Sequence, residues 1–166
     1  ESNNTTLDLQ QFFPSDLKIQ KLETTSDTVY IWMKSRTRNI TCPKCNKECK
    51  IYHAVHKRKV QDLPVWGKRT ILMLSIYEFE CENPDCSCVS TTENFNGFLN
   101  GYSRMTERLA DLVTQLALET SCEGAARILN SMNIAISGDT VIRTLLKRYD
   151  KQTLPSCGSC VGVDNF

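Results

Sequence analysis

Two pairs of cysteines constrain this fold more strongly than any other feature of the sequence. Cys42 and Cys45 lie in CPKC, and Cys81 and Cys86 lie in CENPDC. Zinc takes four thiolates in a tetrahedron, and two short loops can each supply two of them if a β-hairpin brings the loops together. The pairs flank a predicted hairpin. We therefore expect a structural zinc site of the zinc-ribbon kind, with no open coordination position for catalysis.

Other residues near these pairs leave the ligand set open. Cys49 follows the first pair by four residues and Cys88 follows the second pair by two, so either could replace a neighbour. His53 and His56 could also bind a metal, although four thiolates already suffice. Nine cysteines without a recognisable secretory signal favour metal or reduced thiols over disulfides. Buried reduced cysteines are the alternative to a metal site.

The first hundred residues have the alternation that is typical of strands. Residues 17–35 are expected to form a strand pair around the turn TTSD, with apolar residues alternating with Tyr30 and Trp32. A second pair is expected to meet at a turn in LPVWGKRT, before the run ILMLSIYEFE. The sequence thus predicts a mostly antiparallel, β-rich zinc-binding domain over residues 1–100. Asp62 is expected only to cap the hairpin.

From Ser103 the apolar residues recur at spacings of three and four, which predicts three helices up to Tyr149. Ser121 and Ser137 are expected to cap the second and third helices. The fold class predicted for the whole chain is therefore α+β. The apolar face of the third helix is expected to consist of Val141, Ile142, Leu145 and Leu146.

The last two predicted helices, joined by a tight turn, match a helix-turn-helix, so residues 101–151 are expected to form a DNA-binding domain. A helical hairpin that only packs is the alternative. In a helix-turn-helix the second helix enters the major groove of double-stranded DNA with its early residues toward base edges. The exposed side of that helix would carry Asp139, Thr140, Arg143 and Lys147.

The charges are segregated along the chain, although the formal net charge is only +1. Residues 34–70 carry 11 basic and 2 acidic side chains, residues 78–123 carry 2 and 9, and residues 124–151 carry 5 and 2. Basic segments that coincide with recognisable modules are typical of phosphate contact. We expect the cluster HKRK to hold the DNA backbone through His56, Lys57, Arg58 and Lys59.

Five motifs follow one another in an order that resembles a known family. CPKC, HAVHKRKVQDLP, FECENPDC, GAARIL and SGDTVIR are similar to the N-terminal part of bacterial insertion-sequence transposases of the ISL-three family. The resemblance covers nearly the whole chain and ends in VGVDNF, which is similar to the family's V-G-V-D-D-F strand. Asn165 stands where the second acid usually is.

This resemblance implies that residues 152–166 are a linker and the first strand of a truncated RNase H-like DDE domain. Asp164 would be the first of three carboxylates that hold two magnesium or manganese ions. Two-metal chemistry needs several carboxylates to hold the ions ~4 Å apart, so we expect this chain alone to be inactive. Cys157 and Cys160 suggest a second metal site, but no partner pair accompanies them.

The family also implies a full-length enzyme that cuts and joins DNA at terminal inverted repeats. It would work as a homo-oligomer in the bacterial cytoplasm, at the nucleoid. No apolar run reaches the ~18 residues of a membrane span. Two other functions fit the same parts: a zinc-dependent transcriptional regulator without catalysis, and an interaction module whose helices dimerise.

Overall fold

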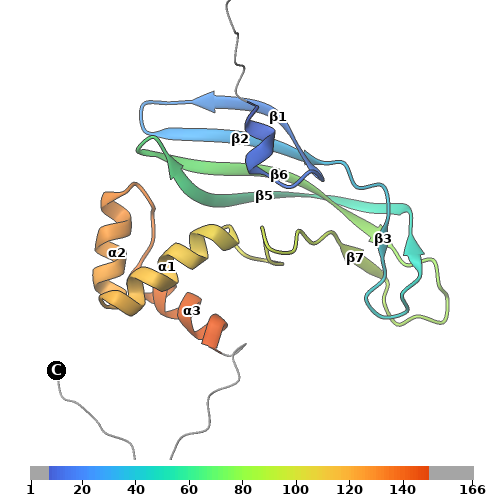
Figure 1. Ribbon diagram of the computed structural model, residues 1–166. Helices are drawn as coiled ribbons and strands as arrows, with labels where there is room; N and C mark the ends of the chain where they lie inside the picture. The colour runs from blue at the N-terminus through green and yellow to red at the C-terminus, as the bar shows by residue number, and fades with distance from the viewer. Residues whose placement is uncertain (1–7, 150–166) are drawn as a thin grey trace, which may run out of the picture.

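The computed structural model describes residues 8–149, which form a twisted sheet with three helices beside it (Figure 1). The last strand ends at Thr92, and the first α-helix begins at Glu107. In chain order the elements are η1 (Leu9–Phe12), β1 (Leu17–Thr24), β2 (Thr28–Ser35), β3 (Ile40–Thr41), β4 (Glu48–Cys49), β5 (Ile51–Val65), β6 (Lys68–Glu80), β7 (Ser90–Thr92), α1 (Glu107–Glu119), α2 (Cys122–Ser131) and α3 (Gly138–Tyr149).

The main sheet has the strand order β1-β2-β6-β5, and β7 adds to the end of β6. Both predicted hairpins are present, β1–β2 and β5–β6, and both are antiparallel. The predicted mostly antiparallel sheet is confirmed, with one exception at its centre, where β2 and β6 pair in parallel. A hairpin fixes the direction only of consecutive strands. Between β2 and β6 the chain forms β3, β4 and β5, so β2 and β6 are not consecutive strands and no hairpin fixes their relative direction.

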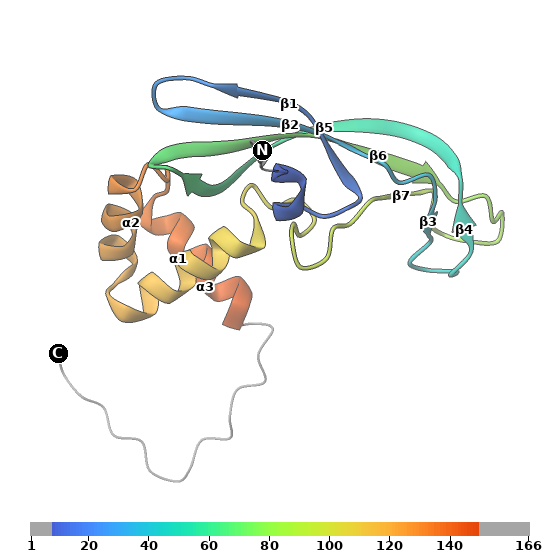
Figure 2. The same cartoon turned by 45° about the horizontal axis from the view of Figure 1, so that its top comes forward.

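One face of the main sheet is packed and the other is open. Figure 2 shows the three helices, η1 and the connection after β7 on the same side of the sheet. On that side β2, β5 and β6 place alternate residues in a core, as the period of two requires. Phe95, Phe98 and Leu99 close this core, whose strand residues include Ile31, Met33, Val60, Leu72, Leu74 and Ile76.

The three helices form a second core of their own. Thr106 and Ser121 cap α1 and α2, and Ser137 Oγ accepts the backbone N–H of Thr140 at the start of α3, as predicted for the two serines. The core consists chiefly of Leu109, Val113, Ala117, Ala125, Leu129, Ile134 and Val141. Among residues 8–149, no helix is long and apolar enough to cross a membrane.

The edge of β5 joins the sheet to the helices. The backbone N–H of Gln61 donates to the Arg104 carbonyl at 2.8 Å, and that of Thr106 donates to the Gln61 carbonyl at 3.0 Å. At the far end of the hairpin, Arg69 Nε donates to the carbonyl of Asn133, in the loop between α2 and α3, at 3.3 Å. These contacts hold the helical core against the covered side of the sheet.

Candidate metal centre and nucleic-acid interface

The four cysteines of the two pairs converge at one end of the long β5–β6 hairpin. Cys42 and Cys45 lie in the β3–β4 connection before β5, and Cys81 and Cys86 follow β6. Their sulfurs all lie within 4.8 Å of one another. The Cys42–Cys86 and Cys45–Cys81 sulfur pairs are 3.9 and 3.7 Å apart. A tetrahedron with Zn–S bonds of about 2.3 Å requires S···S separations of about 3.8 Å, so the four thiols fit zinc.

Backbone N–H groups favour thiolates at the first pair of cysteines, Cys42 and Cys45. The backbone N–H groups of Cys45 and Lys44 are directed at the Cys42 sulfur and lower the pKa of its thiol to about 6. The backbone N–H of Lys47 likewise lowers the pKa of Cys45. Metal ligands must be deprotonated, so turns that direct N–H groups at sulfur prepare this pair to bind a cation.

The two additional cysteines lie outside the cluster. Cys49 is fully buried, its sulfur donates to the carbonyl of Lys47 at 3.8 Å, and burial raises the pKa of its thiol. The sulfur of Cys88 donates to the carbonyl of Ser90 at 3.2 Å, and burial again raises the thiol pKa. The thiol pKa does not separate them from the ligands, because it is raised at Cys86 and to about 12 at Cys81 as well. The position of their sulfurs outside the group of four does.

On α3, three of the four predicted DNA-contact residues are exposed. Asp139, Arg143 and Lys147 follow one another at intervals of four, which places them on one face of the helix. Thr140 is only half-exposed, and its hydroxyl lies 3.0 Å from that of Ser137, so it belongs to the helix cap. Arg148, also on α3, binds Asp111 of α1 at 2.5 Å and has a packing role.

The apolar face of α3 is narrower than predicted. Val141 is buried, and Leu145 packs against the helical core. Ile142 and Leu146 are 43% and 56% exposed, so their assignment to the packed face is wrong. The reason is geometric. The helical core contacts one side of α3, and Ile142 and Leu146 lie on a different side of that helix.

All four residues of HKRK line one open groove, but their side chains do not share one face of the sheet. They lie on β5, where successive side chains alternate between the faces of the sheet. His56 and Arg58 are paired with Ile76 and Leu74, on the side of the helices, whereas Lys57 and Lys59 are paired with Ser75 and Met73 on the opposite side. The period of two along β5 could have revealed this division in the sequence.

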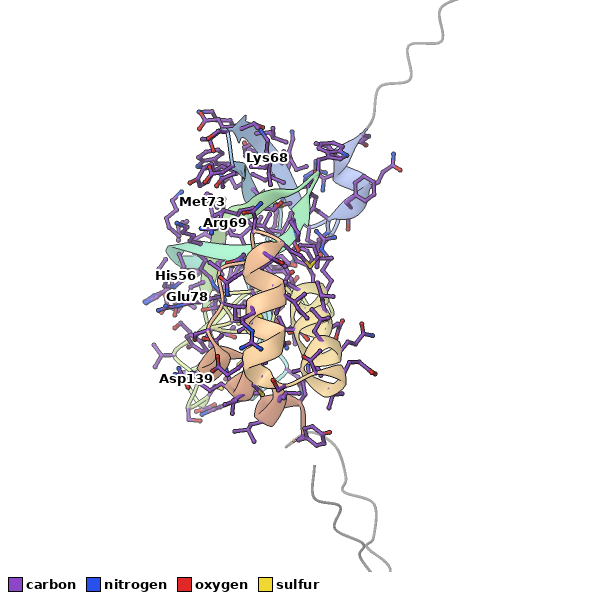
Figure 3. All side chains as sticks on the ribbon, turned by 90° about the vertical axis from the view of Figure 1, so that its left-hand side faces the viewer. His56, Lys68, Arg69, Met73, Glu78 and Asp139 are labelled. Carbon is purple, nitrogen blue, oxygen red and sulfur yellow. The ribbon has the colours of Figure 1, made fainter. Side chains whose placement is uncertain are left out.

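His56 and Arg58 both have protein partners. Figure 3 shows His56 beside Glu78, and His56 Nε2 lies 2.7 Å from a Glu78 carboxylate oxygen. A guanidinium nitrogen of Arg58 donates to the Ser103 carbonyl at 2.6 Å, and burial lowers the pKa of Arg58. Arg58 therefore ties β5 to the chain before α1.

An open groove of about 820 Å³ lies beside these residues. It runs between β5 and the segment 101–104 and contains both charge signs. In Figure 3, Asp139 of α3 lies on the same side of the molecule as His56 and Glu78. All four residues of HKRK line the groove, together with Glu78, Glu93 and Arg104.

Several predicted site residues lie outside the described part of the chain. Asp164 and its expected magnesium or manganese site fall there, as do Asn165, Cys157 and Cys160. Within residues 8–149, Cys42, Cys45, Cys81 and Cys86 form the one cluster of metal-ligand type.

Comparisons with known proteins agree with a zinc site formed by the two cysteine loops. Residues 38–88 match the family model described as the zinc-finger of transposase IS204/IS1001/IS1096/IS1165. The chain is 28% identical over 100 residues to the transposase for insertion sequence element IS1001 of Bordetella parapertussis. That alignment covers 60% of this chain and 24% of the relative, so the chain spans about a quarter of the relative's length. No solved structure matches. The two matches confirm that this chain resembles the N-terminal part of an ISL-three family transposase.

Proposed function

We propose that this chain is the DNA-binding N-terminal region of a DDE transposase and that it recognises the terminal inverted repeats of its insertion sequence. One observation carries the proposal. The helix α3 is packed on one side and presents Asp139, Arg143 and Lys147 to solvent on another. Similarity to the IS1001 transposase supplies the biological setting.

In this proposal residues 1–100 and 101–151 act as a zinc-binding and a helix-turn-helix domain. Cys42, Cys45, Cys81 and Cys86 hold one structural zinc ion. When bound, zinc would cross-link the β3–β4 loop to the chain after β6, and its binding energy would contribute to folding. No catalytic step is assigned to this site, because all four tetrahedral positions are taken by protein ligands.

The exposed stripe of α3 would read base edges in the major groove. Arg143 has the planar, bidentate donors that match the O6 and N7 atoms of guanine. Asp139, in the first turn, can accept a hydrogen bond from the amino group of cytosine. Lys147, one turn beyond Arg143, would contact the backbone, where charge positions the helix without reading sequence.

The groove beside β5 would follow the adjacent DNA backbone. Arg104 is exposed there, and His56 is partly exposed beside Glu78. Arg58 would act indirectly, by holding the Ser103 carbonyl and so the position of the groove wall. Lys57 and Lys59 also line the groove, although their side chains alternate to the other face of the sheet.

The activity of the whole enzyme is part of the same proposal. Asp164 would be the first carboxylate of a two-metal site, completed by acids of a catalytic domain beyond this chain. A homo-oligomer acting at the nucleoid in the cytoplasm would hold two ends together. Ile142, Leu146 and Tyr149, which lie exposed along α3, are candidates for the contact between subunits.

Arg143→Ala tests the base-reading role. We expect it to cost about 1 to 3 kcal/mol on the preferred duplex and to relax the preference at one position. Arg127→Ala is the matched control, because Arg127 is an exposed arginine of α2 that would contact only backbone. It should weaken all duplexes alike and reduce the salt slope by about 1. Unchanged affinity and preference in Arg143→Ala would contradict the assignment.

A further inference from the structure

The open face of the main sheet carries an unusual set of side chains. Two cross-strand rows run over β1, β2, β6 and β5, and we call these eight residues the outer face. The first row is Lys18, Lys34, Ser75 and Lys57, and the second is Lys21, Trp32, Met73 and Lys59. All five lysines are exposed. Figure 2 shows the helices on the other side of the sheet.

The stability of the fold does not explain this concentration of charge. Lys18 and Lys34 are direct cross-strand partners, and like charges placed opposite each other destabilise a sheet. In the next row, which is Glu23, Tyr30, Ile71 and Gln61, Glu23 is the one acid, and it pairs with Lys21. The outer face therefore retains a strong positive potential that an anionic ligand would neutralise.

Aromatic rings lie among these lysines. The Tyr30 and Trp32 rings are neighbours on β2, with centroids 5.8 Å apart. Lys21 Nζ lies 5.2 Å from the Trp32 ring centroid, and Lys34 Nζ lies 5.9 Å from that of Tyr77. Two half-exposed rings thus each have an ammonium group beside them. This arrangement suits a polymer that alternates flat bases with phosphates.

We propose that the outer face binds single-stranded DNA, with bases stacking on Trp32 and Tyr77 and phosphates contacting the surrounding lysines. Duplex DNA fits the rings poorly, because its bases are already stacked on one another and present only their edges. Along β6, Tyr77 lies four residues from Met73, the partner of Trp32, so the two rings are about 13 Å apart along the strand. At ~3.4 Å per nucleotide of a stacked strand, that distance spans at most about four nucleotides.

This surface differs from the one proposed for the inverted repeats, and its binding does not depend on duplex recognition. It faces away from the helices, whereas the exposed stripe of α3 belongs to the helical domain. Unpaired strands arise when duplex DNA is opened or is cut with staggered ends. A transposase that reads duplex ends with α3 would then use the outer face to retain the separated strand.

The test uses the only other tryptophan of the chain, Trp66, which is 83% exposed. In the zinc-loaded Trp66→Asn protein, Trp32 is the sole tryptophan. The probe is a 20-nucleotide oligothymidylate, which forms no duplex, with a fluorescein-labelled copy for anisotropy. We expect binding at 50 mM NaCl, quenching of Trp32 emission and a salt slope of about −2 to −3.5, at about −0.7 per phosphate contact.

Variants locate the contact. Lys57→Glu combined with Lys59→Glu should weaken oligothymidylate binding more than ~10-fold, with zinc content and circular dichroism unchanged. Lys34→Ala alone should reduce the salt slope by about 0.7. Arg143→Ala combined with Lys147→Ala should leave this binding unchanged while impairing duplex recognition, so the two proposals fail separately.

Four results would overturn the inference. The first is the absence of oligothymidylate binding at 50 mM NaCl, and the second is equal binding by the Lys57→Glu, Lys59→Glu protein. The third is binding without any change in Trp32 emission, and the fourth is equal competition by a 20-base-pair duplex. Either of the last two would show that bases do not stack on the outer face.

Discussion

Asp62 and Arg108 join the sheet to the first helix through a two-pronged ion pair. Asp62 is 2% exposed on β5, and its carboxylate accepts from Arg108 Nε at 2.8 Å and from a second guanidinium nitrogen. Thr106, the N-cap of α1, donates to the same carboxylate at 2.6 Å. Asp62, expected from the sequence only to cap the hairpin, therefore joins β5 to α1 and holds the helices against the sheet.

Asp62→Asn tests this joint. Removing the charge leaves the Arg108 guanidinium and the Thr106 hydroxyl poorly paired, so we expect a loss of about 2 to 3 kcal/mol in the free energy of unfolding, measured by urea denaturation. Asp111→Asn is the control, because Asp111 forms an exposed ion pair with Arg148 and should cost under ~1 kcal/mol. Equal losses in the two variants would contradict a special role for Asp62.

The four-thiolate site predicts which cysteine substitutions abolish zinc binding and which leave it intact. Cys42→Ser or Cys86→Ser should abolish stoichiometric zinc and loosen the loops around Phe79, which is fully buried beside them. Cys49→Ala and Cys88→Ala should keep one zinc per chain, because their sulfurs lie outside the cluster. Metal analysis of the purified proteins decides the ligand set, and zinc loss in Cys88→Ala with retention in Cys86→Ser would reverse it.

Glu78 should make stability depend on pH in the acid range. Its hydrogen bond from Ser90 and its contact with His56 hold the pKa of the carboxyl below its ordinary value. The folded state therefore favours the carboxylate. The stabilisation is complete above the ordinary glutamate pKa of about 4.3 and is lost as the pH falls through the lower folded pKa.

Unfolding curves of wild type and Glu78→Gln between pH 3 and 6 measure this effect. The wild type should be the more stable at pH 6, and the difference between the proteins should shrink as the pH falls. Acid release of zinc affects both proteins and leaves the difference intact. A difference that stays constant over the whole range would show that the Glu78 charge contributes nothing.

The turn between β5 and β6 contains an unfavourable residue. Trp66 has φ 50° and Gly67 has φ 74°, so both residues of this two-residue loop are left-handed. Such turns favour Asn-Gly. Trp66→Asn should raise the free energy of unfolding by about 1 kcal/mol, since Trp66 is 83% exposed and little packing is lost. Trp66→Ala also removes the indole, but alanine tolerates the left-handed conformation less well than asparagine does. It should therefore raise the free energy of unfolding by less.

Local features of the sequence predicted the local features of the fold. The alternation in residues 17–35 and the turn before Lys68 predicted both hairpins, and serine caps predicted helix starts. Cys42, Cys45, Cys81 and Cys86 were identifiable because metal-ligand spacing is local within each pair. The choice between them and the neighbouring thiols needed the positions of the sulfurs in the folded chain.

Long-range relationships could not be predicted in this way. The parallel pairing of β2 with β6 and the bond between Asp62 and Arg108 join residues tens of positions apart, and no local period encodes them. The exposure of Ile142 depends on which side of α3 the other helices pack. The outer face was partly visible, because Tyr30 and Trp32 alternate with the buried residues of β2, but its rows of lysines required the strand register.

The most direct test of sequence-specific DNA recognition is fluorescence anisotropy at ~150 mM salt. The zinc-loaded chain is titrated with duplexes tiled across the DNA that flanks its coding region, with and without a chelator. Selective binding to one imperfect inverted repeat, lost on chelation, is the predicted result. Uniform weak binding to all tiles, or none, would contradict recognition of DNA ends by this region.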